Sequence, residues 1–349
     1  MTKRKDYITV LNVLSALAVV YLHANTFWEY SSEPIWVLSN VIECLFYFAV
    51  PVFFMITGAT LLGYRNRNTT KQFFKKRFEK TVIPFIFWSI FSLLFSIALQ
   101  AFLYGIDSVH YSVLDIINAF TNSKYLYNPI YWYFPALFTV YMSIPVLSAI
   151  DENKKKSVYR YIIIGSFVVN TVLPFVTSLT RGKIGYSGSF YFAMGIEHIQ
   201  YLVIGYYIDN YEIKKSHRMA IYAAGIAGLL VHFFGTWWLT ARNGDISMLF
   251  KGYTGAPAVI YSVAIFLLFK NINYDKVPKL IMNTVSFFRN QTFGVYLIHY
   301  FIVVLINISG FVNINSVFYK LLAPIVIFVM SSFIIKVMQK IPAIKKIVP

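Results

Sequence analysis

The run Ile8–Phe27, ITVLNVLSALAVVYLHANTF, contains twenty residues and no aspartate, glutamate, lysine or arginine. Crossing about 30 Å of hydrocarbon takes roughly 20 helical residues, so this run predicts a membrane-spanning helix. The rest of the chain has the same character, because 58% of its 349 residues are hydrophobic and only 13% are charged. Soluble proteins are roughly 45–50% apolar and about 25% charged. The composition therefore excludes a soluble globular protein and indicates an integral membrane protein.

Nine further apolar runs of about 18 or more residues follow, each bounded by charged or turn residues. Pro51 lies inside the first of them, which is long for one span, and it predicts a tilt or a kink there. We therefore expect an all-α polytopic membrane protein, a single integral-membrane domain of residues 1–349 with about ten transmembrane helices. The nine runs are Trp36–Gly63, Val82–Leu103, Tyr131–Ala149, Tyr161–Leu179, Phe190–Ile208, Met219–Thr240, Tyr253–Phe269, Thr292–Ile308 and Phe318–Ile335.

The lysines and arginines predict the orientation of these spans. With a cytoplasmic N-terminus and alternating loops, 25 of the 31 fall on the inner side, as the positive-inside rule requires. Both termini are then expected to be cytoplasmic. The net charge of +17 is explained by the topology of the chain in a lipid bilayer, its expected partner, and does not indicate binding to nucleic acid. The six outer cations are Lys124, Arg181, Lys183, Arg242, Lys251 and Lys320. Five of the six tryptophans fall at the outer interface, where aromatic belts form: Trp28, Trp36, Trp132, Trp237 and Trp238.

A few ionisable side chains lie inside the predicted spans, where they are costly unless they face a bundle interior or a wet cavity. Counted at about 1.5 Å per residue, all but His299 lie in the outer half of the bilayer. A common depth predicts a shared polar cavity, and the alternative is that a neighbouring helix satisfies each group singly. Their spacing matches no metal-binding pattern, so no metal site is expected. The residues are His23, Glu43, Glu197, His198, His232 and His299.

His23 and Glu43 lie on the first two predicted spans and suggest a catalytic pair. A carboxylate that accepts a hydrogen bond from one imidazole nitrogen leaves the other nitrogen free to take a proton. Asn12 lies eleven residues before His23, so the two share one helix stripe about 16 Å long. Such a stripe lines a passage from the cytoplasm to His23, unless Asn12 only bonds a neighbouring helix.

Five cations within ten residues form a basic inner loop: Lys71, Lys75, Lys76, Arg77 and Lys80. One interpretation is a positive-inside anchor beside anionic headgroups. The other is a phosphate site in which Arg77 and Lys80, on one helix face, reach an anionic nucleotide carrier. The two interpretations are compatible.

Five blocks of sequence occur in order along nearly the whole chain: Leu11–His23, Pro51–Leu62, Phe73–Pro84, Tyr131–Leu137 with Tyr141 and Pro145, and Thr292–His299. Together they resemble the membrane-bound acyltransferase 3 family. In that family an arginine is followed by ten residues and a histidine in the first span, and two arginines precede a proline in the basic loop. This chain has Asn12 and Lys80 at two of those arginines, and Tyr131 where the family commonly has histidine.

The resemblance implies acyl transfer from a cytoplasmic acyl-CoA, usually acetyl-coenzyme A, to a hydroxyl of a cell-envelope polysaccharide or lipid-linked glycan. It implies a multi-pass protein of the bacterial cytoplasmic membrane, with His23 as general base beside Glu43. No permanently bound cofactor is expected, because the thioester arrives activated. The expected donor-binding residues are Asn12, Lys76, Arg77 and Lys80. The further candidates for the cavity wall are Tyr131, Trp132, Glu197, His198, His232, Arg242, Tyr296 and His299.

Two other hypotheses fit the same sequence. A transporter or flippase of a glycan or lipid intermediate would use Glu43, Glu197 and His198 as a coupling-ion or substrate site. A catalytically altered relative that senses or scaffolds would explain Asn12 and Tyr131. For acyl transfer itself, direct transfer with His23 as base and an acyl-histidine intermediate both remain open, as does the oligomeric state.

Overall fold

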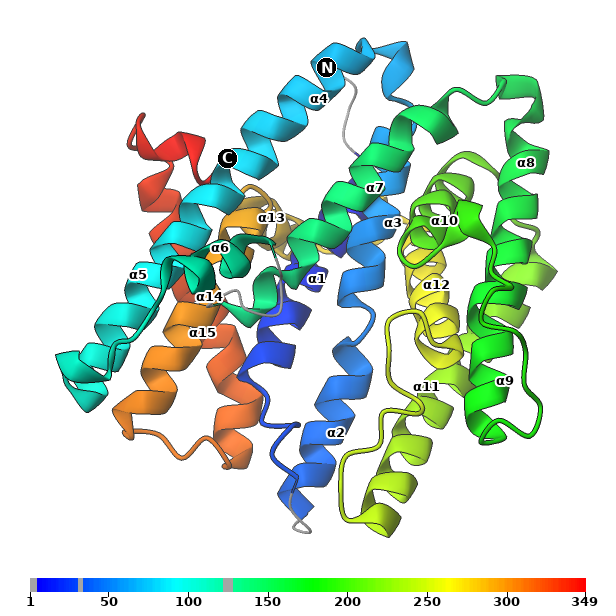
Figure 1. Ribbon diagram of the computed structural model, residues 1–349. Coiled ribbons are helices and arrows are strands. Elements are labelled where there is room, and N and C mark those ends of the chain that lie inside the picture. Colours follow the sequence, from blue (N-terminus) through cyan, green and yellow to red (C-terminus); the bar gives the residue numbers. More distant parts are fainter. Residues whose placement is uncertain (1–4, 31–33, 122–127) are drawn as a thin grey trace.

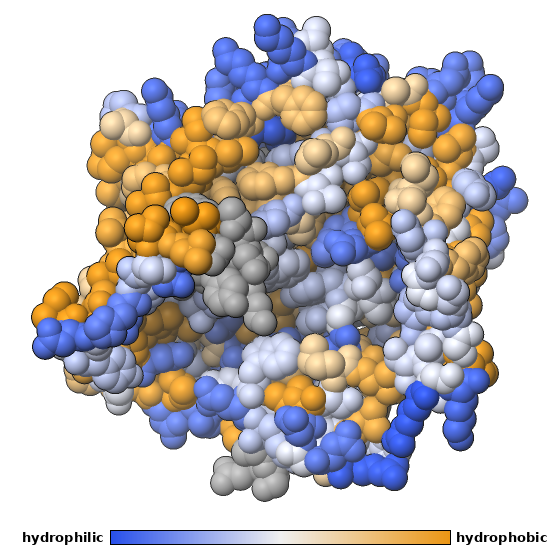
Figure 2. Space-filling view, viewed as in Figure 1, coloured by the Kyte–Doolittle hydropathy of each residue, from blue (hydrophilic) through white to orange (hydrophobic). Residues whose placement is uncertain are grey.

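The structure, a computed structural model, describes residues 5–30, 34–121 and 128–349, and within these ranges it contains helices and no strand. Figure 1 shows the helices running between two ends of a bundle, with α4 and the C-terminus at the same end. Figure 2 shows hydrophilic residues gathered at both ends and hydrophobic residues on the flanks between them. The prediction of an all-α polytopic membrane protein is confirmed.

Eight stretches of helix in the described ranges are long and apolar enough to cross a membrane. They contain α1 (Asp6–Ala24), α2 (Pro34–Phe46) with α3 (Ala49–Leu61), α4 (Thr70–Arg77) with α5 (Ile83–Tyr104), α7 (Tyr133–Ser148), α8 (Glu152–Gly165) with α9 (Leu173–Leu179), α11 (Lys215–Asn243), α14 (Thr292–Ser309) and α15 (Val317–Met338). The other α-helices are α6 (Val113–Thr121), α10 (Ile199–Asn210), α12 (Ala256–Lys270) and α13 (Lys279–Phe288).

Eight of the ten predicted runs lie in these stretches, and the other two form shorter helices, α10 and α12. The run 190–208 begins as an irregular segment in which Glu197 has a left-handed backbone with a φ of 47°, so α10 begins only at Ile199. The run 253–269 begins in a loop, and α12 begins at Ala256. Hydropathy alone does not separate an apolar helix from an apolar loop buried by its neighbours.

The long run 36–63 is broken between α2 and α3, at Tyr47 and Phe48. Pro51 does not kink a continuous helix there, because it lies in the first turn of α3. Proline is tolerated in a first turn, where its missing N–H would have no partner within the helix.

Two π-helical segments interrupt the long helices, Phe78–Val82 between α4 and α5 and Ser166–Val172 between α8 and α9. A proline follows each segment, Pro84 and Pro174. The ring of a proline collides with the carbonyl group four residues earlier in a regular α-helix, and the wider π turn relieves that collision.

Helices α3 and α10 cross with their backbones in contact at two glycines. A Cβ atom on Gly58 would lie 1.8 Å from the carbonyl oxygen of Leu202, and one on Gly205 would lie 2.0 Å from that of Met55. Small residues allow membrane helices to approach this closely. Because Thr57 on α3 lines the cavity described below, the crossing fixes one wall of the site.

We expect Gly205→Ala to lower the stability of the fold, by about 1–3 kcal/mol, because the added methyl group forces two backbones apart. The melting temperature of the purified protein in detergent measures this loss. Gly63→Ala is the matched control, since a Cβ atom there has no neighbour within 4 Å. Equal melting temperatures for the two variants would contradict the close crossing.

Candidate active site

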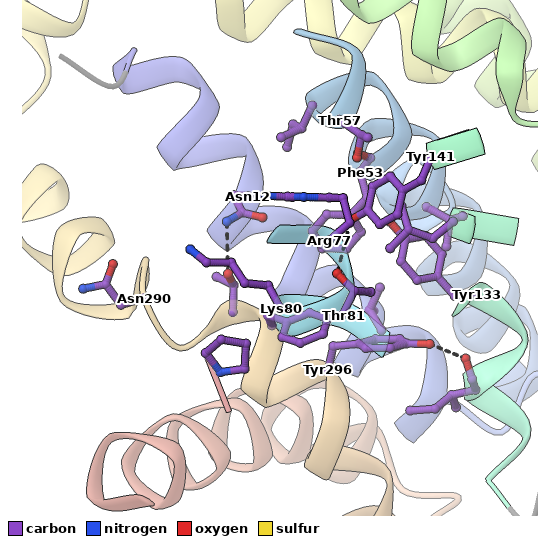
Figure 3. A pocket seen from close by; sticks show the side chains of 18 of the residues that line it. Asn12, Phe53, Thr57, Arg77, Lys80, Thr81, Tyr133, Tyr141, Asn290 and Tyr296 are labelled. Carbon is purple, nitrogen blue, oxygen red and sulfur yellow. Dashed lines mark hydrogen bonds between the residues drawn. The ribbon is translucent and has the colours of Figure 1, made fainter. Parts of the chain in front are cut away.

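A cavity of about 700 Å³ lies between α1, α3, α7, α14 and the π-helical segment that follows α4 (Figure 3). This volume is within the range of roughly 300–1,000 Å³ that is typical of small-molecule sites. Polar and aromatic side chains make up much of its wall. They include Asn12, His23, Thr57, Arg77, Lys80, Thr81, Trp132, Tyr133, Tyr141, Tyr253, Arg289, Asn290, Thr292, Tyr296 and Lys345.

The charged side chains on the cavity wall have one sign. Arg77, Lys80, Arg289 and Lys345 line the cavity, and the described part of the chain contributes no aspartate or glutamate to its lining. Four cations without a carboxylate partner make a region of positive potential, which attracts an anion.

Arg77 is the cation held most firmly in this wall. Its guanidinium lies 6.0 Å from the ring centroid of Phe73 and 5.7 Å from that of Tyr141. Its Nε is buried, and no hydrogen-bond partner for it occurs among the residues that the structure describes. Leaving a buried donor unsatisfied is costly. The side chain is therefore oriented by aromatic rings, and its Nε–H has no acceptor among the described residues.

Asn12 extends the polar wall along α1 toward His23. Its side-chain amide donates to Thr292 Oγ1 on α14 at 3.0 Å, and both residues line the cavity. Figure 3 shows how Asn12, Arg77 and Lys80 face the same space. Asn12 thus bonds a neighbouring helix and also lines the cavity.

His23 pairs with a second histidine, His299 on α14. His23 Nδ1 lies 2.8 Å from His299 Nε2, and His299 Nδ1 lies 2.8 Å from the carbonyl oxygen of Val295. The two rings are nearly parallel, with centroids 5.1 Å apart. His23 lines the cavity, whereas His299 is fully buried behind it.

This chain of contacts determines where the protons lie in two neutral rings. A carbonyl oxygen only accepts, so His299 Nδ1 carries the proton and donates it to Val295. His299 Nε2 then has a free lone pair and accepts from the Nδ1–H of His23. The remaining nitrogen of His23, Nε2, is left without a proton, and that is the form a general base requires.

Comparison with known proteins gives the same family as the sequence blocks. The chain matches the family model for the acyltransferase 3 type of acyltransferase domain over residues 5–338, nearly its whole length. This protein belongs to the acyltransferase 3 family. Members of the family are membrane O-acyltransferases, and this multi-pass membrane protein is accordingly an acyltransferase. The comparison with curated proteins and the comparison with solved structures returned no match.

One of the donor-binding residues predicted for the acyltransferase does not reach the cavity. Lys76 is exposed and donates to Asn68 Oδ1 at 2.5 Å, while its neighbour Arg77 lines the site. Successive side chains of an α-helix point about 100° apart. Lys76 therefore points to solvent, whereas Arg77 points into the cavity.

The predicted pairing of His23 with Glu43 is wrong. Glu43 Oε1 lies 3.3 Å from Lys251 Nζ, and Glu43 Oε2 accepts a hydrogen bond from Asn25 at 3.4 Å. Sequence reasoning placed both groups at one depth, but depth does not specify the direction in which a side chain leaves its helix. His299, counted nearer the middle of the bilayer, is the residue that bonds His23.

Of the other predicted wall residues, Trp132 and Tyr296 line the cavity of the acyltransferase, and the others do not. Tyr131 is fully buried behind the wall and donates to the carbonyl oxygen of Leu297 at 2.8 Å. The remaining four residues lie outside the lining for different reasons. Glu197 is exposed, His198 packs on Phe54 with ring centroids 4.5 Å apart, His232 is buried beside Tyr47, and Arg242 lies exposed over Trp238.

Sequence reasoning missed Arg289, Tyr253 and Lys345, which line the cavity. Arg289 lies three residues before Thr292, the start of a block already assigned to the family, and this proximity was the available signal. Tyr253 and Lys345 carry no comparable pattern, because they come from a loop and from the C-terminal segment. The described residues hold no cluster of three or more potential metal ligands.

Proposed function

We propose that this acyltransferase transfers an acetyl group from acetyl-coenzyme A to a hydroxyl of a cell-envelope polysaccharide or lipid-linked glycan, in the bacterial cytoplasmic membrane. One observation carries the proposal: a single cavity joins four cations without a carboxylate to His23. The four cations can bind the phosphates of a donor, and the histidine can take the proton of a hydroxyl.

The donor follows from the charge and the length of this cavity. Arg77 and Lys80, with Arg289 and Lys345, offer sites for several phosphate oxygens. Asn12 and His23 are separated by about 16 Å along α1, a distance suited to an extended pantetheine arm with its thioester near His23. The basic end lies on the side of the bundle that carries α4 and the C-terminus (Figure 1), which the charge distribution predicts to be cytoplasmic.

The chemistry needs few protein groups because the thioester is already activated. The hydroxyl oxygen of the acceptor forms a bond to the carbonyl carbon while His23 Nε2 takes the hydroxyl proton. The bond between that carbon and the sulfur then breaks, and the coenzyme A thiolate receives the proton from His23. His299 accepts a hydrogen bond from His23 Nδ1–H, so that Nε2 is the nitrogen that takes the proton and returns it.

The proposed function is tested with purified protein in proteoliposomes. Acetyl-coenzyme A and polysaccharide isolated from the envelope of the expressing bacterium are supplied, and mass spectrometry follows acetyl groups on the polysaccharide. We expect acetylation that depends on the protein, with release of free coenzyme A. Flipping or uptake of the glycan without an acyl donor, and no acetylated product, would reject the proposal.

We expect His299→Phe to slow acetyl transfer by about tenfold or more, because His23 loses the acceptor that orients its Nδ1–H. His299→Gln is the conservative control, since its amide oxygen can accept that hydrogen bond. The KM for acetyl-coenzyme A stays unchanged in both variants. Equal rates for the phenylalanine and glutamine variants would show that the hydrogen bond does not position His23.

A further inference from the structure

A buried ion pair lies outside the cavity, between α2 and the loop that precedes α12. The side chains of Glu43 and Lys251 are 5% and 0% exposed, and Glu43 Oε1 lies 3.3 Å from Lys251 Nζ. The ammonium group also lies 4.0 Å from the ring centroid of Phe27 and 4.8 Å from that of Tyr47. Neither charged residue lines the cavity, so the proposed chemistry does not use the pair directly.

The pair fastens an irregular segment to the helices. Residues 244–255 join α11 to α12 without forming an α-helix, and Lys251 is the point at which this segment contacts Glu43. The next two residues of the segment each make a hydrogen bond. The backbone N–H of Gly252 donates to Tyr47 Oη at 3.1 Å, and Tyr201 Oη donates to the carbonyl oxygen of Tyr253. Three successive residues of the segment are therefore anchored.

The last of these residues, Tyr253, is part of the cavity wall. Its ring stacks on Trp132, with centroids 5.5 Å apart and planes at 18°, and on Tyr47, at 4.5 Å and 15°. Tyr253 also packs against a small apolar cluster that contains Leu22, the residue before His23. The anchored segment thus supplies an aromatic wall near the histidine, whereas Arg77 and Lys80 come from a different part of the chain, the α4–α5 junction.

We propose that Glu43 and Lys251 are positioning residues that hold Tyr253 against Trp132, and that this aromatic wall binds the acceptor. The inference rests on the proposed function, because it assigns the acceptor to the part of the cavity that the donor's phosphates do not occupy. Removing one member leaves the other as an uncompensated buried charge, which is strongly unfavourable. In Glu43→Gln the unpaired ammonium group of Lys251 moves toward water and takes the segment with it. In Lys251→Met the unpaired carboxylate of Glu43 draws water between α2 and the segment.

The first experiment separates acceptor binding from donor binding. Glu43→Gln, Lys251→Met and the double variant are assayed with acetyl-coenzyme A and isolated envelope polysaccharide. We expect each single variant to raise the KM for the polysaccharide at least about tenfold, with the KM for acetyl-coenzyme A unchanged. The double variant recovers most of the loss, since it leaves no unpaired charge and keeps the hydrogen bonds of Gly252 and Tyr253.

A matched control removes a glutamate from another ion pair with a buried lysine. Glu152 pairs with Lys155 on α8, and neither residue lines the cavity. We expect Glu152→Gln to leave both KM values unchanged. The inference is overturned if the Glu43 and Lys251 variants raise both KM values equally, if they lower only the yield of folded protein, or if the double variant recovers nothing.

A second readout does not depend on catalysis. Trypsin cuts after lysine, and Lys251 is enclosed in the native protein. We expect mass spectrometry to detect a cut after Lys251 in the Glu43→Gln protein, and none in the native or Glu152→Gln proteins under the same mild digestion. If the native protein transfers no acetyl group, the proposed function fails, and this digestion still tests the anchoring. Equal resistance of Lys251 in all three proteins would overturn it.

Discussion

His23→Ala is expected to lower the rate of acetyl transfer by about 10²–10⁴-fold, the contribution typical of a positioned general base. No other histidine lines the cavity among the described residues, and His299, the nearest candidate, is fully buried with its Nδ1 engaged by Val295. The KM for acetyl-coenzyme A is expected to stay within about twofold of the native value, because the substitution leaves Arg77 and Lys80, the proposed phosphate site, unchanged. Transfer of labelled acetyl groups at saturating donor measures the loss.

The double variant His23→Ala with His299→Phe serves as the control for this prediction. If His299 acts only through His23, the second substitution adds no further loss, since residues that act as a unit are not additive. Retention of full activity by His23→Ala would remove His23 from the chemistry. If the decrease in rate in the double variant equals the product of the two single decreases, His299 has a role separate from His23.

Arg77→Ala is expected to raise the KM for acetyl-coenzyme A by about 10- to 100-fold, because hydrogen bonds to charged groups contribute about 1.5–3 kcal/mol each. The guanidinium is already oriented by Phe73 and Tyr141, so little ordering is left for the donor to impose. Arg77→Lys is expected to recover only part of the affinity, since an ammonium group lacks the bidentate geometry. Steady-state kinetics at constant ionic strength, with donor as the varied substrate, measures the change.

Lys76→Ala is the matched control, because it removes one positive charge from the neighbouring position while leaving the cavity intact. We expect its KM for acetyl-coenzyme A to equal that of the native protein. An equal increase in both variants would indicate that the basic loop acts through its net charge alone, as a positive-inside anchor does. In that case the specific assignment of Arg77 to the donor would be wrong.

The sequence predicted the helical class because membrane crossing is governed by composition over about 20 residues. It located Arg77, Lys80, Asn12 and His23 on the cavity wall because all four lie in blocks whose spacing is local. Where the prediction depended on long-range contacts it was less successful. Hydropathy predicts a span where the segment before α10 is irregular, and Glu43 contacts Lys251 and Asn25 instead of the predicted His23.

Charge and hydropathy along the chain therefore determined by themselves that this is an all-helical membrane protein, and motif order indicated its family. The tertiary structure alone decided which polar groups meet. His23 on α1 and His299 on α14 are in contact although they are 276 positions apart in the sequence. Lys251 contacts Glu43 from a loop whose sequence has no periodic pattern. The physical reason is that depth in a bilayer follows from position along one helix, whereas the facing partner depends on how each helix is rotated by its packing.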